Sequence, residues 1–138
     1  MASRIIKRGE VYYANLDDAI GHEQKNDKNT ERRSAVVVSN NKQNEQNKVV
    51  VVVPLSSKVH NIKFFFQVPT FFQGVRGKAK CEQVRAITIE RFEEKLGELT
   101  EKEMNEIEEK LVFVLHLENL IKRRVQIIVQ KYLKLSKL

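Results

Sequence analysis

Short apolar runs alternate with polar segments along the first 89 residues, which is the pattern of strands joined by loops. Two Val-rich runs, at residues 35–39 and 49–54, predict buried strands because β-branched side chains are restricted at χ1 and suit a pleated sheet. Several short strands separated by turn signals indicate a small barrel or sandwich. The further strands that the pattern predicts lie at residues 10–14, 64–68, 78–84 and 86–89.

Three polar segments separate these predicted strands. The Asn-, Gln- and Lys-rich residues 40–48 are expected to form a hairpin loop. Residues 17–33 form an unusually long polar loop, and residues 56–63 follow directly after a buried strand. Long ordered loops are often functional, and disorder is the competing interpretation.

Beyond residue 90 the pattern becomes helical. Thr100 followed by Glu103 predicts a capping box, in which the two side chains satisfy free amide groups of the first turn. An apolar stripe at spacings of three and four residues follows, and only Glu118 interrupts it. The tail is therefore predicted to be a basic amphipathic helix, continuous with the first or hinged near Glu118, that pairs with another helix or folds back onto the barrel. The stripe consists of Met104, Ile107, Leu111, Val114, Ile121, Val125, Ile128, Tyr132 and Leu135.

Length and composition limit the class of protein. A chain of 138 residues, 41% apolar and 31% charged, has the size and balance of one globular domain. No apolar run reaches the roughly 18 residues of a membrane span, and no signal peptide is visible, so we expect a cytoplasmic protein without a membrane partner. Cys81 is the only cysteine, which excludes an intrachain disulfide and a cysteine metal cluster. We expect its thiol to be a small core group rather than a nucleophile.

The charge is unevenly distributed. Residues 1–89 carry a net charge of +7, residues 90–117 carry −5, and residues 118–138 carry +5. A basic first part, an acidic helix and a basic tail suggest one surface for a polyanion and another for a different partner. The alternative is that the lysines only keep the chain soluble.

Five short segments occur in an order that resembles one known family. They read Lys-Arg-Gly-Glu-Val-Tyr from residue 7, Gly-His-Glu-Gln from residue 21, Arg-Ser-Ala-Val-Val-Val from residue 33, Val-Pro-Leu-Ser-Ser from residue 53, and Glu-Gln-Val-Arg-Ala from residue 82. None is specific alone, but together they cover residues 7–117 and resemble the MazF/PemK toxins. We accordingly divide the chain into a toxin domain at residues 1–117 and a helical extension at residues 118–138.

The resemblance implies a mainly β fold with α-helices, namely an SH3-like small β-barrel of the CcdB/MazF type with a C-terminal helix. It also implies a bacterial endoribonuclease that cuts single-stranded RNA selectively by 2′-OH attack, without a metal or other cofactor. The implied partners are the RNA, a second copy of the chain in a homodimer, and a cognate antitoxin protein.

The resemblance also assigns candidate site residues. Arg33 and Ser56 take the places of the family's central arginine and threonine, and Glu23 takes that of a loop carboxylate near the site. A planar, permanently charged guanidinium beside a hydroxyl suits a phosphodiester, which must be held while its charge increases. Each of the three also has an ordinary structural interpretation, as a solvated charge, a turn hydroxyl and a cap. The predicted RNA contacts are Gln24, Lys58, Lys78, Lys80, Gln83 and Arg85.

Other residues are given structural or competing roles. Arg32 competes with Arg33, and Glu82 is expected to be a buried structural partner. His22 and His60 lie on long loops that do not fix their geometry, so we do not assign them acid–base roles. Lys63 and Arg76 are further candidates for phosphate contacts. Most of the rings among Phe64, Phe65, Phe66, Phe71 and Phe72 are expected in the core, with base stacking as the alternative.

Three departures from the family pattern bear on activity. The polar residues 25–32 lengthen the loop before Arg33, Ser34 replaces a proline, and Ser56 lacks the methyl group that fixes a threonine rotamer. We therefore also consider a catalytically silent relative that binds nucleic acid or a protein partner. A CcdB-like gyrase inhibitor is a further alternative, although the chain has none of the tryptophan that such inhibitors use.

Overall fold

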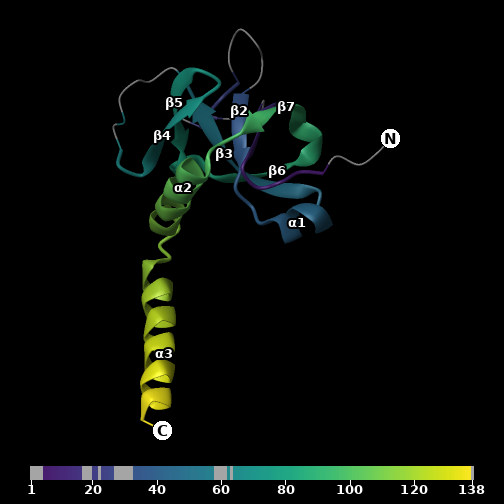
Figure 1. Cartoon of the computed structure of the whole chain (residues 1–138). Helices are drawn as coiled ribbons and strands as arrows, with labels where there is room; N and C mark the ends of the chain where they lie inside the picture. The colour runs from purple at the N-terminus through teal and green to yellow at the C-terminus, as the bar shows by residue number, and fades with distance from the viewer. Residues whose placement is uncertain are drawn as a thin grey trace.

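A computed structural model describes residues 5–16, 20–21, 23–26, 33–57, 62 and 64–137. A curled sheet forms the body, one helix packs against it, and a second helix projects away from it (Figure 1). The strands are β1 (Glu10–Ala14), β2 (Arg33–Val37), β3 (Val49–Ser56), β4 (Gln67–Phe72), β5 (Val75–Lys80), β6 (Arg85–Thr88) and β7 (Phe92–Glu98). The helices are α1 (Asn41–Gln46), α2 (Glu101–Val114) and α3 (Glu118–Ser136), with short 3-10 turns η1 (Cys81–Gln83) and η2 (Ile89–Arg91).

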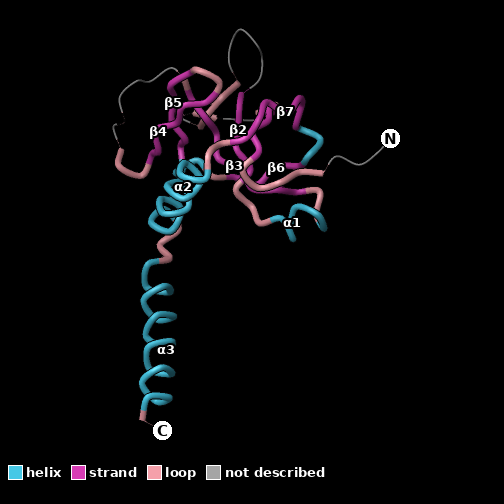
Figure 2. The backbone as a smooth tube through the Cα atoms, viewed as in Figure 1, coloured by secondary structure: helices cyan, strands magenta, loops and turns pink. Residues whose placement is uncertain are grey.

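The long strand β3 causes the sheet to curl. Its first half pairs with β6, and its last two residues, Leu55 and Ser56, pair with β5. The described strands follow the order β4-β5-β3-β2-β1-β7, and all of their pairings are antiparallel. One strand that pairs with different neighbours at its two ends bends the sheet into a half-barrel (Figure 2). The predicted fold class, mainly β with C-terminal helices, is confirmed.

Alternating side chains of the central strands form a core on each face of the sheet. One core combines Val36 and Leu55 with Met104 and Ile107 from α2. The other contains Tyr12, which stacks on Phe92 at 4.8 Å between ring centroids. Cys81 is fully buried in the first core, as expected for a small core residue.

The helix α2 begins where the sequence predicted. The Thr100 hydroxyl accepts from the Glu103 backbone N–H at 3.1 Å, and the Glu103 carboxylate accepts from the Thr100 N–H at 3.0 Å. The apolar stripe of α2 faces the sheet, with Met104 and Ile107 buried and Leu111 packed against the same core. Local capping and helical periodicity were therefore sufficient to identify this element.

Several predictions along the chain were wrong. Residues 40–48 contain the helix α1, which is capped by the Asn40 side chain accepting from the Gln43 N–H, rather than a simple hairpin loop. Residues 64–66 form a turn, and β4 begins at Gln67 and continues through Pro69. A proline is tolerated there because β4 is an edge strand that pairs only with β5. The predicted strand at 78–84 ends at Lys80, and β7 was missed.

The phenylalanine side chains were also assigned incorrectly. Phe64, Phe65 and Phe71 are exposed, and Phe66 and Phe72 are half-buried, so most of these rings lie outside the core. The ring of Phe65 instead meets that of Phe113 on α2, with centroids 4.5 Å apart.

A turn separates α3 from α2. His116 has a φ of 56°, a left-handed conformation that ends α2 before α3 begins at Glu118. Of the two predicted arrangements, the hinged one is therefore observed, and α3 extends away from the sheet (Figure 1). Every residue from 115 to 137 is exposed. No helix in the described ranges is both long and apolar enough to cross a bilayer.

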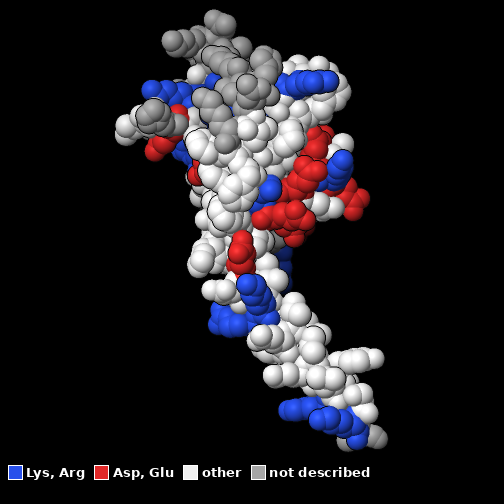
Figure 3. Space-filling view, turned by 90° about the vertical axis from the view of Figure 1, so that its left-hand side faces the viewer, with Lys and Arg blue, Asp and Glu red and all other residues white. Residues whose placement is uncertain are grey.

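The uneven charge of the sequence is visible on the surface. Acidic side chains gather on the body, whereas Lys and Arg side chains gather near the two ends of α3 (Figure 3). The helix α3 contains only one acidic residue, Glu118.

Candidate active site

Arg33 and Ser56 lie at adjoining ends of two neighbouring antiparallel strands, at the start of β2 and the end of β3. The two strands pair through Val37↔Val52, Val36↔Val53 and Ala35↔Pro54, and this pairing ends two residues short of Arg33 and Ser56. Both residues are largely buried, at 7% and 5% exposure, and both line one pocket of about 250 Å³.

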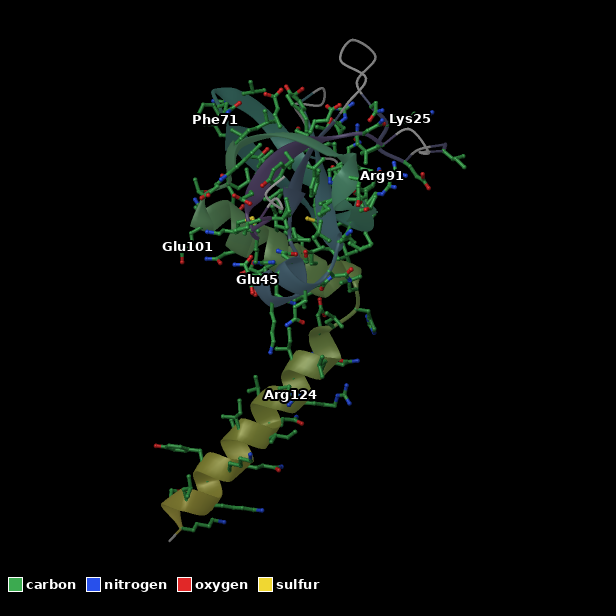
Figure 4. All side chains as sticks on the ribbon, turned by 90° about the vertical axis from the view of Figure 1, so that its right-hand side faces the viewer. Lys25, Glu45, Phe71, Arg91, Glu101 and Arg124 are labelled. Atoms are coloured by element: carbon green, nitrogen blue, oxygen red, sulfur yellow. The ribbon has the colours of Figure 1, made fainter. Side chains whose placement is uncertain are left out.

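The backbone of the preceding loop orients Arg33. Its Nε donates to the Lys25 carbonyl oxygen at 2.9 Å, which fixes the guanidinium against that loop. Lys25 lies at the end of the body that is remote from Arg124 of α3 (Figure 4). The site and the projecting helix are therefore at opposite ends of the molecule.

A glycine permits the close approach of β5 to Ser56. A Cβ atom on Gly77 would lie 2.6 Å from the Ser56 carbonyl oxygen, which is too close for any other residue without a backbone shift. Gly77 lies inside β5 but one residue before the strand predicted at residues 78–84, so its role was not recognised from the sequence. Thr70 and Tyr13 also line the pocket and had not been identified as site residues.

Two lysines, Lys78 and Lys80, lie on β5, the strand that pairs with the end of β3 at Ser56. Lys78 pairs with Ser56 across β5 and β3 and is only 4% exposed. Burial lowers the pKa of Lys80, the charges of Lys78 and Arg33 lower it further, and Glu82 opposes the shift. A bound anion would offset the positive charges that act on Lys80. This part of the surface therefore suits phosphate.

A second pocket, of about 610 Å³, holds four further candidate residues. It is lined by Glu23, Gln24, Gln83 and Arg85, among others. The Gln24 backbone N–H donates to the Gln83 side-chain oxygen, which fixes this loop against η1. The Gln24 Oε1 atom is buried and has no hydrogen-bond partner among the residues that the structure describes.

Glu23 and Glu82 have identifiable structural contacts. The Glu23 carboxylate accepts from the Ile20 N–H at 2.9 Å, so the capping interpretation describes its present contact. Gln67 Nε2 donates to both Glu82 oxygens, at 3.1 and 2.7 Å, and thereby ties β4 to η1. Glu82 is the expected structural partner, although it is half-buried rather than buried.

Some predicted residues cannot be placed in this geometry. Lys58, Lys63, Arg32, His22 and His60 lie outside the described residues.

The remaining reactive groups are the Cys81 thiol and the side chains of types that bind metal ions. Burial raises the pKa of the Cys81 thiol to about 12, so the reactive thiolate is suppressed at neutral pH. Within the ranges that the structure describes, no group of three or more His, Cys, Asp or Glu side chains is arranged to hold a metal ion.

An arginine, a serine and neighbouring lysines on a curled antiparallel sheet thus form a candidate anion-binding site on a small β-barrel protein. The family described as PemK-like, MazF-like toxin of type II toxin-antitoxin system matches residues 7–115. The chain belongs to this family, and the resemblance found in the sequence is confirmed. A comparison with curated proteins finds no match.

Solved structures show the same fold. MazF from Deinococcus radiodurans aligns with a TM-score of 0.70 and 24% identity, covering 83% of this chain and 99% of that one. An endoribonuclease in complex with its cognate antitoxin from a mycobacterial species aligns with a TM-score of 0.65 and 24% identity, covering 81% and 96%. A MazE–MazF structure from D. radiodurans aligns with a TM-score of 0.63 and 21% identity, covering 82% of this chain and 97% of that one.

Proposed function

We propose that this protein is the endoribonuclease toxin of a type II toxin–antitoxin module and cleaves single-stranded RNA selectively without a metal. The observation that carries the proposal is the shared pocket of Arg33 and Ser56, with Lys78 paired beside it. Family membership and the endoribonuclease with a similar fold support it. The proposal places this activity in the bacterial cytoplasm.

The proposed reaction is attack by a ribose 2′-OH on the adjacent phosphorus. The 2′-oxygen forms a bond to phosphorus while the bond to the 5′-oxygen breaks, which gives a 2′,3′-cyclic phosphate and a 5′-hydroxyl end. The Arg33 guanidinium stabilises the charge on the phosphorane and donates the proton that the leaving 5′-oxygen needs. The Ser56 hydroxyl hydrogen-bonds the phosphate and positions the 2′-OH. In this scheme no step requires a cofactor.

Glu23 is proposed to accept the proton from the 2′-OH. It lines the neighbouring pocket, and its carboxylate now accepts from the Ile20 N–H. Accepting the proton therefore requires the loop to rearrange when RNA binds. A Glu23→Gln variant tests this role, since it preserves the shape of the side chain but removes the base.

The second pocket is proposed to hold a nucleotide beside the cleaved bond. Its volume of about 610 Å³ is within the usual range for ligand pockets. The buried Gln24 Oε1 atom offers an acceptor to a base amino group, and leaving such an atom unpaired costs about 1–3 kcal/mol. Gln83 and Arg85 complete this contact surface, and Lys80 together with Lys58 extends the phosphate contacts. Selectivity would then arise in this pocket.

Two protein partners complete the proposal. Solved relatives are named as MazE–MazF and as an endoribonuclease with its cognate antitoxin. We propose by analogy that a cognate antitoxin covers the site of this chain, and that two copies form a homodimer that shares the RNA groove.

The direct test is incubation of the full chain with a long single-stranded RNA in EDTA. Discrete fragments with cyclic phosphate ends are expected, and the mapped cut sites would define the preferred sequence. Arg33→Ala should reduce the rate at least 100-fold, and Ser56→Ala by about 10- to 100-fold. Lys42→Ala, which removes an exposed cation of α1, serves as the matched control. Tight binding without cleavage by the wild type would instead identify a silent RNA-binding relative.

A further inference from the structure

The helix α3 presents an uncovered apolar stripe. Its members follow one another at spacings of four, three, four and three residues, which is the seam that helices use to pair. They are 45–72% exposed, and the helix is about 28 Å long at 1.5 Å per residue. Contiguous apolar surface of this kind marks an interaction site. The seam consists of Ile121, Val125, Ile128, Tyr132 and Leu135.

Cations border this seam. Arg124 and Lys131 each directly precede a seam residue, and Lys122 follows one, so a heptad places all three beside the contact. Two such seams packed against each other would bring these like charges together, with Glu118 as the only carboxylate on the helix. Pairing of α3 with another α3 is therefore disfavoured. The fitting surface has an apolar centre and acidic borders.

The helix α2 carries such a surface near its C-terminal end. Phe113 and Phe65 are in contact there and are 42% and 61% exposed. Glu109 and Glu106 precede Phe113 by four and seven residues, which puts both carboxylates on the same helix face as the ring. Lys110 lies over the Phe65 ring, 5.5 Å from its centroid. We call this surface the aromatic–acidic patch of α2.

We infer that α3 of one copy packs on the aromatic–acidic patch of a second copy, and that the two copies exchange their α3 helices reciprocally. The net charges of +5 in residues 118–138 and −5 in residues 90–117 complement each other. Acidic side chains on the body and cations along α3 appear on the same face of the molecule (Figure 3).

The hinge explains why a second copy is required. The left-handed His116 directs α3 away from the body, so the helix does not lie on the patch of its own chain (Figures 1 and 2). Reciprocal exchange gives two symmetric contacts, and stable interfaces bury about 1,200–2,000 Å² in total. Because α3 lies far from the site of Arg33, this inference stands or falls independently of the proposed nuclease.

Charge exchange within the full chain tests the contact. Two double variants reverse the charges, Arg124→Glu with Lys131→Glu on α3 and Glu106→Lys with Glu109→Lys on α2. Each should weaken self-association at least 10-fold, as measured by analytical ultracentrifugation. Combining all four substitutions in one chain should restore most of the wild-type affinity. Arg123→Glu with Lys134→Glu makes the same charge change on the opposite side of α3 and should leave self-association unchanged. Circular dichroism confirms that each variant is folded.

Apolar variants and other ligands separate the remaining outcomes. Val125→Asp with Ile128→Asp should lower the mass of the assembly to the same extent as the charge variants. An unchanged mass in these variants, or no restoration by the fourfold variant, would overturn the inference. Loss of flotation with phosphatidylglycerol vesicles at unchanged mass would identify a lipid surface instead. Loss of single-stranded RNA binding at unchanged mass would identify RNA as the occupant, which also overturns it.

Discussion

Arg33 and Ser56 lie on neighbouring antiparallel strands and line the same pocket, although they are 23 positions apart in the chain. The backbone of β2 and β3 thus determines their separation, and each side chain is largely buried. A guanidinium whose Nε is already bound to the Lys25 carbonyl has little freedom to turn. Preorganised donors of this kind are the principal means by which enzymes stabilise developing charge.

Arg33→Lys should show how much of the Arg33 contribution to cleavage comes from its charge and how much from the shape of the guanidinium. The substitution keeps one positive charge but loses the planar fork that matches phosphate and the Nε–H that donates to Lys25. We expect RNA affinity to fall only a few-fold and the cleavage rate to fall about 100-fold. Single-turnover rates at saturating RNA measure the effect, and wild-type rates in this variant would show that charge alone is sufficient.

Lys80→Ala should weaken RNA binding and reduce its salt dependence. Each phosphate contact on single-stranded RNA contributes about −0.7 to the slope of log K against log salt concentration. Removing one contact should therefore make the slope shallower by about that amount. Fluorescence anisotropy across a series of KCl concentrations measures the slope. Lys42→Ala is the control, and an identical slope for Lys80→Ala would place Lys80 outside the RNA path.

Gly77→Ala should disturb the site through the backbone. The added Cβ would meet the Ser56 carbonyl oxygen at 2.6 Å, so β3 and β5 must move apart where they hold Ser56. Overpacking of this kind costs about 1–3 kcal/mol of unfolding free energy. Urea denaturation and cleavage assays should both show a loss. Val75→Ala, at an exposed position of the same strand, should change neither.

Glu10 should make stability depend on pH in the acid range. Burial alone would raise its pKa, but hydrogen bonds from Lys95 Nζ at 2.5 Å, the Lys7 N–H at 2.6 Å and the Tyr12 hydroxyl at 3.0 Å together hold the pKa below its ordinary value of 4.5. A carboxyl with a lowered pKa stabilises the fold above pH 4.5, and this contribution disappears as the pH falls through the folded-state pKa.

The matched variant for this effect is Glu10→Gln. We expect it to lose about 1–3 kcal/mol of stability at pH 7 and to show a flatter stability profile below pH 4.5. Urea unfolding at a series of pH values gives both quantities. A profile with the wild-type slope would mean that other carboxyl groups cause the acid dependence.

The sequence alone determined the elements whose signals are local. The Val-rich runs became β2 and β3, the Thr100–Glu103 capping box began α2, and the three–four spacing placed Met104 and Ile107 in the core. Five ordered motifs were enough to identify the family. These features depend on χ1 restriction, free amide groups and helical period, which act within a few residues.

Only the tertiary structure decided the remaining features. The pairing of β2 with β3 brings Arg33 and Ser56 to one pocket, and the turn at His116 directs α3 away from the body. The ring of Phe65 packs against that of Phe113 rather than in the core. Gly77 matters because another strand approaches it closely, which its own neighbours in sequence do not reveal. Each outcome depends on contacts between segments distant along the chain, and local propensities do not encode which of those segments meet.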